Sequence, residues 1–261
     1  MPGEDVRPTT HIEGMCMGKT HAVSTTAIAL ACAAPLALLL GQHLSPFAVI
    51  AFAGVAGGYG VLPDLDHPSA TLAHTLGPVT KAVSEVVHKL SGGHRKGTHT
   101  LWFAAGMTAL VTFLCGRFGV WAQAPVIFIG LFLALMLMKL APRRGSGAGE
   151  IVYAVEAAAL TWGTVQFVGT LAWLPWAVGV GVVGHIMGDI PTTAGVPVLY
   201  PLLPKLKLKV PLLGDTGSQR ESIFAWLCGA AVVWMIFAVL TGNHWWAVVW
   251  LAHPSAWHLA F

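Results

Sequence analysis

The sequence predicts an all-α polytopic membrane protein, a transmembrane helix bundle of about seven spans. Its 261 residues are 56% hydrophobic and only 10% charged, and they include 11 Trp. An ordinary soluble domain of this length carries more polar residues, because its surface faces water. Apolar runs of helix length recur along the chain, and about 20 such residues cross a hydrocarbon core of roughly 30 Å. The composition therefore excludes an ordinary soluble enzyme or binding module.

Seven apolar runs supply the expected spans. They cover residues 22–41, 46–62, 100–117, 121–140, 151–171, 174–190 and 222–240. The second run is rich in glycine, including Gly57, Gly58 and Gly60, and small residues let helices pack closely in lipid. Residues 79–90, between the second and third spans, have the pattern of an amphipathic helix lying on the membrane.

Composition divides the chain into three parts. Residues 1–20 are polar and mixed in charge, which is typical of a flexible cytoplasmic lead, and residues 21–243 form the membrane-embedded domain. Residues 244–261 are rich in Trp and interrupted by Pro254, which predicts an interfacial tail. The four cysteines have no CxxC spacing, so we expect neither a disulfide framework nor a thiolate metal site. They are Cys16, Cys32, Cys115 and Cys228.

The positions of lysine and arginine predict one topology. With the amino terminus in the cytoplasm, 13 of the 14 basic residues fall in inner loops or at inner helix ends, and only Arg117 lies outside. These residues occupy short loops and form no basic stripe, so no nucleic acid is expected as a stable partner. The expected partner is the lipid bilayer, and the sequence leaves the oligomeric state open.

Histidines and acidic residues gather at the ends of the spans. His185 and Asp189 lie four apart at the end of the sixth run, so a helix places both on one face, where they can bind one metal ion. A polar pair that merely meets water at a helix end has the same pattern. The topology favours the metal site, because it places the other His and Asp clusters at the same cytoplasmic interface.

We expect seven of these residues to be metal ligands. They are His21, Asp64, Asp66, His94, His99, His185 and Asp189. Glu221 is a further ligand or the general base, and Arg95 holds either a phosphate or a lipid headgroup. Asp64 and Asp66 have an alternative role as turn-capping residues after Pro63. The remaining loop histidines, His67, His74 and His88, are left outside the ligand set.

Imidazole and carboxylate ligands suit Zn²⁺, with Mn²⁺ or Mg²⁺ as alternatives, and the number of candidates suffices for one to three ions. A metal lowers the pKa of a bound water to roughly 7, and a second ion can hold a phosphoryl oxygen. This chemistry predicts a metal-dependent hydrolase. A metal or proton transporter is an alternative, because ionisable residues in membranes mark ion pathways. A membrane scaffold with a structural metal is another.

Three motifs carry a resemblance to a known family. They are Leu62-Pro63-Asp64-Leu65-Asp66-His67-Pro68-Ser69, then Gly93-His94-Arg95 with Thr98-His99, then His185-x-x-x-Asp189 followed by Thr193-Ala194-Gly195-Val196-Pro197. In this order, between His21 and about Glu221, they resemble the YdjM family of LexA-regulated, membrane-bound, metal-dependent hydrolases. The resemblance implies a multi-pass protein of a bacterial inner membrane. Through a remote relation to zinc-dependent phospholipase C, it also implies a phosphoester substrate, with lipids among the candidates.

Overall fold

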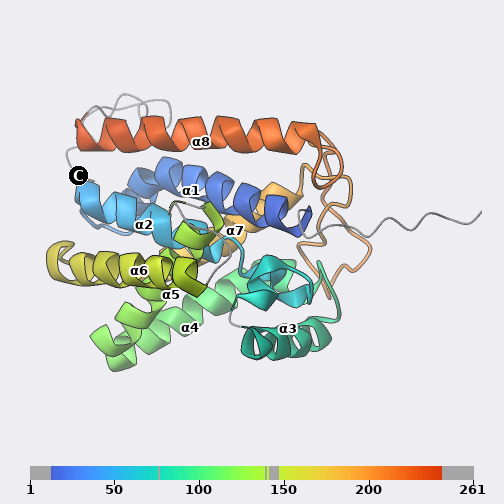
Figure 1. Cartoon of the computed structure of the whole chain (residues 1–261), viewed down its shortest axis with the longest axis horizontal. Helices are drawn as coiled ribbons and strands as arrows, with labels where there is room; N and C mark the ends of the chain where they lie inside the picture. Colours follow the sequence, from blue (N-terminus) through green and yellow to red (C-terminus); the bar gives the residue numbers. More distant parts are fainter. Residues whose placement is uncertain (1–12, 76, 139, 141–146, 243–261) are drawn as a thin grey trace, which may run out of the picture.

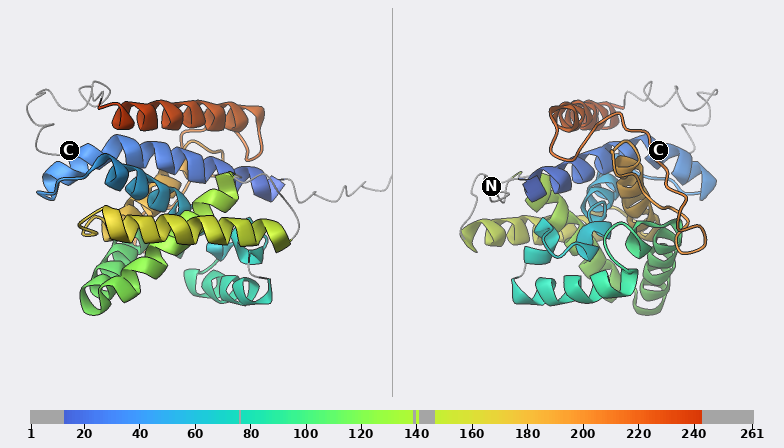
Figure 2. Two further views of the ribbon diagram at one scale, coloured as in Figure 1. Left: turned by 60° about the vertical axis from the view of Figure 1, so that its left-hand side comes forward. Right: turned by 90° about the vertical axis from the view of Figure 1, so that its right-hand side faces the viewer.

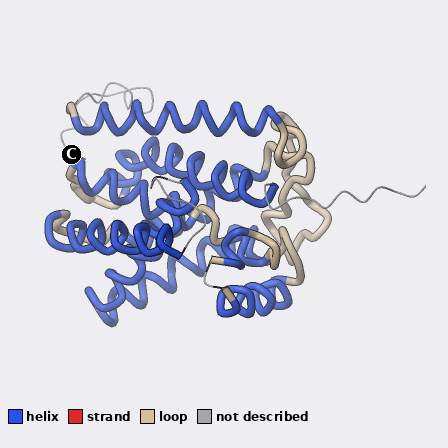
Figure 3. Tube along the Cα trace, viewed as in Figure 1, coloured by secondary structure: helices blue, strands red, loops and turns tan. Residues whose placement is uncertain are grey.

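The computed structural model describes residues 13–75, 77–138, 140 and 147–242 (Figure 1). Over these residues the chain is helical, and its only β-structure is two isolated bridges (Figure 3). The expected all-α class is confirmed. Of the expected lead and tail, residues 1–12 and 243–261 lie outside the described residues, whereas residues 13–20 belong to the first helix.

Each of the seven apolar runs forms an α-helix. The helices are α1 (Glu13–Leu39), α2 (Pro46–Tyr59), α4 (Leu101–Phe118), α5 (Val120–Met138), α6 (Gly147–Phe167), α7 (Leu174–Asp189) and α8 (Gln219–Leu240). Within the described ranges, α1, α4, α5, α8 and the segment that begins with α2 are long and apolar enough to cross a membrane. α7 has only 16 residues, fewer than the roughly 20 that a bilayer core requires. Both the length and the apolar content that a membrane span requires are therefore shown for five of the seven runs.

Capping residues fix where several of these helices begin. Ser45, Thr100 and Ser218 each use the side-chain oxygen to accept a hydrogen bond from the backbone N–H three residues later. Such caps satisfy N–H groups that have no partner inside the helix. The caps of α4 and α8 lie next to residues of the candidate site, so they also fix the helix ends that carry those residues.

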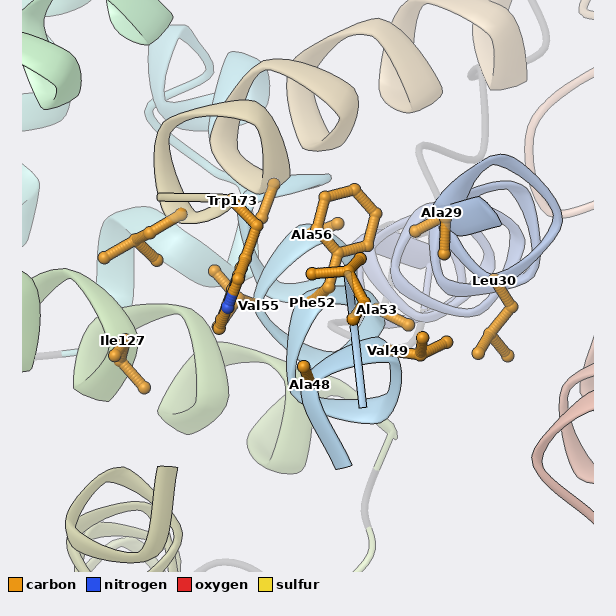
Figure 4. Close-up of a cluster of buried hydrophobic side chains, with 14 of the residues drawn as sticks. Ala29, Leu30, Ala48, Val49, Phe52, Ala53, Val55, Ala56, Ile127 and Trp173 are labelled. Carbon is orange, nitrogen blue, oxygen red and sulfur yellow. The ribbon is translucent and has the colours of Figure 1, made fainter. Parts of the chain in front are cut away.

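The short helix α7 lies at the centre of the bundle, packed against α1, α2 and α4 (Figure 1). Eleven of its 16 residues are buried, so neighbouring helices surround it and it does not need full spanning length. α2 packs against α1 and α5, α8 against α1, and α6 against α5. Phe52, Ile127 and Trp173 are among the buried side chains of the largest core cluster (Figure 4).

Close contact between α2 and α5 depends on Gly58 and Gly130. A Cβ atom on Gly58 would overlap the carbonyl carbon and oxygen of Gly130, so a larger residue would push the two helices apart. Helices in lipid associate through such close van der Waals packing of small residues. The close packing expected of the glycine-rich second run is confirmed.

Three 3-10 helices and one α-helix form a small lobe at one end of the bundle (Figure 1). They are η1 (Pro63–Asp66), η2 (Thr71–His74), α3 (Pro78–Ser91) and η3 (Gly97–His99). The amphipathic helix expected at residues 79–90 is α3, and it turns a side with small polar residues toward the protein. Ser84 is buried there, and the Thr80 hydroxyl donates a hydrogen bond to the carbonyl oxygen of Ala73.

Another side of α3 carries an exposed apolar stripe. Its members are Val79, Val83, Val86 and Leu90. In the right-hand view of Figure 2, α3 lies lengthwise while α8 is seen nearly end-on. A helix that crosses the direction of the spans and turns apolar residues outward has the form of an interfacial helix. Its contact with lipid stays a prediction.

Candidate metal centre

Side chains from four elements meet at the end of the bundle where the lobe lies. They are His21 from α1, Asp64 and Asp66 from η1, His99 from η3, and His185 and Asp189 from α7. These six residues are each at most 7% exposed. Buried ionisable groups are costly unless their charges are balanced, so a buried cluster of this kind is typical of a functional or metal site.

His99 and His185 face each other through their Nε2 atoms, which lie 3.1 Å apart. His185 Nδ1 lies 2.7 Å from the carbonyl oxygen of Gly60, which can only accept, so Nδ1 carries the proton. His99 Nδ1 lies 3.0 Å from the Thr98 hydroxyl, and this hydroxyl donates to Asp66, so its oxygen accepts from the ring. Both Nε2 lone pairs therefore point into the same gap, where a cation is needed between them.

Asp64 and Asp189 complete a set of four donors around this gap. Asp64 Oδ1 lies 3.5 Å from His185 Nε2 and 3.7 Å from His99 Nε2. Asp189 Oδ2 lies 3.5 Å from His99 Nε2 and 3.7 Å from His185 Nε2. Donors at roughly 2.0–2.1 Å around a tetrahedral Zn²⁺ are about 3.3–3.4 Å apart. The distances from each carboxylate oxygen to the two imidazole nitrogens thus come close to those around such an ion. Asp189 Oδ2 is buried with no hydrogen-bond partner.

His21 extends the cluster on the side of α1. Its ring stacks on that of His185 with 3.9 Å between centroids, and its Nε2 atom lies 3.6 Å from Asp189 Oδ1. Gly188 makes room for this ring, because a Cβ atom there would lie 2.9 Å from His21 Nδ1. His21, Asp64 and His185 form one compact donor group, and His99, His185 and Asp189 form another. The buried His and Asp clusters can therefore hold a metal ion.

Asp66 lies behind His99 and not in the gap. Its Oδ1 atom accepts from His94 Nδ1 at 2.8 Å, and its Oδ2 atom accepts from the Arg95 backbone N–H at 3.1 Å and the Thr98 hydroxyl at 2.6 Å. A carboxylate on the Nδ1 side of a ligand imidazole fixes the tautomer and orientation of the ring. Asp66 therefore lies where it could orient His99 from the side away from the gap, and its role as a direct ligand stays a prediction.

His94 lies at the edge of the cluster. It forms a third compact donor group with Asp64 and His99, although its Nδ1 atom is engaged by Asp66. The side chain is less buried than those of the six central residues, with 26% of its surface exposed. Its role as a ligand stays a prediction.

Arg95 connects the lobe to the end of α7. Its Nη2 atom donates to Asp189 Oδ1 at 2.9 Å, and its Nη1 atom donates to the Thr192 hydroxyl at 3.2 Å. Its backbone has a φ of 58°, a left-handed conformation that is unfavourable for a residue with a side chain. Residues held in this way by their surroundings are common at functional sites. Arg95 therefore orients Asp189 and keeps a guanidinium beside the donor cluster.

The surrounding carboxylates control the protonation of His99. Burial lowers the pKa of His99, but the neighbouring carboxylates of Asp64, Asp66 and Asp189 outweigh it and raise the pKa to about 9. The site therefore favours a positive charge at this position. A bound metal ion would supply that charge.

A small pocket, with room for about one water molecule, lies beside the donor cluster. Its walls include His21, Arg95, Asp189, Thr192 and Glu221. Glu221 comes from the first turn of α8 and is only 7% exposed. One of its carboxylate oxygens, Oε2, accepts from the Gly217 backbone N–H at 2.6 Å. The pocket thus brings a carboxylate and a guanidinium together with two of the candidate ligands.

Sequence reasoning missed three contributors to the site. The Gly60 carbonyl orients His185, and a backbone carbonyl leaves no signal in a sequence. Thr192 pairs with Arg95, although a threonine after a helix-ending proline is unremarkable by itself. Gly188 admits the His21 ring, and its spacing of three from His185 on the same helix is a signal that could have been used.

The three histidines left outside the ligand set take other positions. His88 Nδ1 lies 2.6 Å from the backbone carbonyl oxygen of Asp66, so it supports the η1 turn. His67 Nδ1 lies 2.9 Å from the Ser69 hydroxyl, and its ring packs edge-on against His94. His74 is exposed at the end of η2. Two of them therefore support the lobe that carries the site.

Comparison with known families identifies the relationship. The YdjM inner membrane protein family matches residues 15–247, which include every residue of the donor cluster and the pocket. The chain belongs to the YdjM family. Comparisons with curated proteins and with solved structures found no match. Membership of the YdjM family and five helices of spanning length together identify an inner membrane protein whose surroundings are the lipid bilayer.

Proposed function

We propose that this YdjM protein is a metal-dependent hydrolase of phosphoesters. The observation that carries the proposal is the set of four donors around the His99–His185 gap, next to a pocket that contains Glu221. Imidazole and carboxylate donors suit Zn²⁺, with Mn²⁺ or Mg²⁺ as alternatives. A divalent ion bound there would lower the pKa of a water to roughly 7 and so supply a hydroxide nucleophile.

Residues of the pocket have the chemistry for the remaining tasks. Glu221 presents a carboxylate that can accept a proton from an attacking water. An arginine side chain has five N–H donors. Arg95 uses two of its side-chain nitrogens to donate hydrogen bonds to Asp189 and Thr192. The remaining donors are suited to the oxygens of a phosphoryl group. Asp66 supports the reaction indirectly, because it fixes the orientation of His99.

Arg95 is also the reason for proposing a phosphoester as the substrate. A guanidinium pairs with the charged oxygens of a phosphate, which an uncharged carboxylic ester lacks. The pocket lies where the helices of spanning length end, so a substrate with a lipid tail can approach it from the bilayer. Phospholipids and isoprenoid phosphates are therefore the substrates to test first, and we propose that the site faces the cytoplasm, as the basic residues predict.

The test begins with metal analysis of the full chain purified in detergent. It continues with hydrolysis assays on phosphate monoesters, phosphate diesters, phospholipids and isoprenoid phosphates. We expect retained divalent metal and metal-dependent turnover on at least one class. Glu221→Gln should abolish turnover while metal remains bound, because Glu221 is assigned to proton transfer. His43→Ala is the matched control, since His43 is exposed in the turn between α1 and α2.

Two results would replace the proposal. Bound metal without turnover on any class, together with variants that lose metal and thermal stability in parallel, would assign a structural metal. Metal flux into proteoliposomes that is lost in Asp64→Asn would assign transport. Turnover that persists unchanged in Glu221→Gln would leave hydrolysis intact but remove Glu221 from its role.

A further inference from the structure

An exposed loop of leucines and lysines follows the site in the sequence. Residues 201–212 are all exposed. The loop carries six large apolar side chains, Leu202, Leu203, Leu206, Leu208, Val210 and Leu212, and three lysines, Lys205, Lys207 and Lys209. Leu202 and Leu212 are 69% and 68% exposed. A contiguous set of exposed apolar residues marks an interaction surface, because leaving it in water is unfavourable.

The backbone of this loop is fixed to the segment that follows α7. Leu208 N–H donates to the carbonyl oxygen of Val196 at 2.9 Å, and Val196 N–H donates to that of Leu208 at 3.0 Å. Val210 N–H donates to the carbonyl oxygen of Ile190 at 2.9 Å. The apolar side chains are therefore presented outward by a hydrogen-bonded backbone, and their exposure is part of the fold.

The loop lies between the pocket and the lobe. The next residue, Leu213, lines the pocket together with His21 and Arg95. At the other end, a Cβ atom on Gly92, the C-cap of α3, would lie 3.1 Å from the Tyr200 hydroxyl oxygen. The loop and the lobe lie at the same end of the bundle in Figure 1. The exposed loop thus adjoins the helix that carries the exposed apolar stripe.

The charge of the loop indicates what covers it. Lysines are its only charged residues, and the first acidic residue after them is Asp215. Lysine and leucine alternate from Lys205 to Lys209. A lysine can lay its apolar stem along a hydrophobic surface while its ammonium group meets a phosphate. Leucines with interleaved lysines therefore match an anionic membrane surface, in which apolar chains lie beneath charged headgroups.

We propose that residues 202–212 bind anionic phospholipid headgroups and insert their leucines into the leaflet at the edge of the pocket. The lysines contact headgroup phosphates, and the leucines enter the acyl-chain boundary. This contact is independent of the proposed hydrolysis, because it requires neither the metal nor a reaction. It would also place lipid headgroups beside Arg95, which the pocket shares with Leu213.

The test measures the depth of the loop in nanodiscs. The full chain, with its four native cysteines replaced by alanine, carries Leu206→Cys labelled with an environment-sensitive fluorophore. It is reconstituted in phosphatidylcholine alone or with added phosphatidylglycerol, and nitroxide lipids serve as quenchers. We expect a blue shift and stronger quenching in the anionic discs. Lys205→Gln, Lys207→Gln and Lys209→Gln together should reduce the lipid-bound population on the order of 100-fold, since each lysine near the surface contributes about fivefold.

The matched control replaces the same three lysines by arginine, which keeps the charge and should keep the quenching. Metal content is measured in each variant and should equal that of the parent. Emission that is identical in neutral and anionic discs, or unchanged by the three Lys→Gln substitutions, would overturn the proposal. A shift that depends on protein density in the disc would overturn it as well, because it would assign the leucines to contacts between protein copies.

Discussion

The Nε2 atoms of His99 and His185 lie 3.1 Å apart, although the two histidines are 86 positions apart in the chain. Each ring is fixed from behind, His185 by the Gly60 carbonyl and His99 by Thr98 with Asp66. Neither ring can turn away without losing its hydrogen bond. The gap between them is therefore preorganised for a cation, as a site needs to be if its ligands are to bind without rearrangement.

Removal of either ring should remove the metal. We expect His185→Ala and His99→Ala each to weaken Zn²⁺ binding by more than about 100-fold. Loss of a residue that only orients a ligand weakens metal binding by at most about that factor. Titration of the purified full chain against a competing chelator measures this change. His43→Ala, in an exposed turn, should bind metal like the parent. Parent-like affinity in His185→Ala would mean that the metal lies elsewhere.

The position of Asp66 predicts a smaller effect than that of Asp64. Asp66→Asn replaces one of the oxygens that accept from His94, Arg95 and Thr98. It should lower metal affinity by roughly 10–100-fold, the usual cost of losing a partner that orients a ligand. Asp64→Asn should cost more, because Asp64 Oδ1 faces both Nε2 atoms. The same chelator competition compares the two variants. Equal losses of metal affinity in the two variants would indicate that Asp66 is a direct ligand, as the sequence predicted.

Gly188 offers a test of the role of His21. Gly188→Ala places a Cβ atom 2.9 Å from His21 Nδ1, and the ring cannot move freely because it stacks on His185. We expect strain of about 1–3 kcal/mol, typical of overpacking, seen as weaker metal binding and lower thermal stability. Gly106→Ala is the matched control, since nothing lies within 4 Å of a Cβ atom there. Equal metal affinity and stability in the two variants would show that the His21 ring position is unimportant.

The contact between α2 and α5 predicts a purely structural effect. Gly58→Ala would make a Cβ atom overlap the backbone of Gly130, so the helices must separate. We expect a loss of stability of about 1–3 kcal/mol, measured by thermal unfolding in detergent. Gly116→Ala, which adds a Cβ atom in open space on α4, should change little. A parent-like unfolding temperature in Gly58→Ala would show that the two helices can separate at no cost.

The helices could be predicted from the sequence because run length and apolar content alone decide whether a segment crosses a membrane. The seven runs correspond to seven helices, and the end of α7 at Asp189 lies one residue from the expected boundary at residue 190. The central place of α7 was not predictable. It depends on which helices pack together, as the overlap between Gly58 and Gly130 shows for α2 and α5.

For the candidate site, the sequence predicted that histidines and aspartates gather at one end of the bundle. The distinction between Asp64 and Asp66 was not predictable, because both lie in the same Pro-Asp-Leu-Asp turn. Only the direction of each carboxylate separates them, and a 3-10 turn sets that direction. The support of His185 by the Gly60 carbonyl was equally hidden, since it involves backbone and not a side chain.

The orientation of the protein in the membrane gives the last prediction. The basic residues predict that the end with the metal centre faces the cytoplasm. Lys96 is exposed beside Arg95, and His43 is exposed in the turn between α1 and α2 at the other end. In a chain without native cysteines, a membrane-impermeant maleimide should label Lys96→Cys only in inside-out vesicles. It should label His43→Cys only in intact spheroplasts, and the reverse pattern would place the metal centre on the periplasmic side.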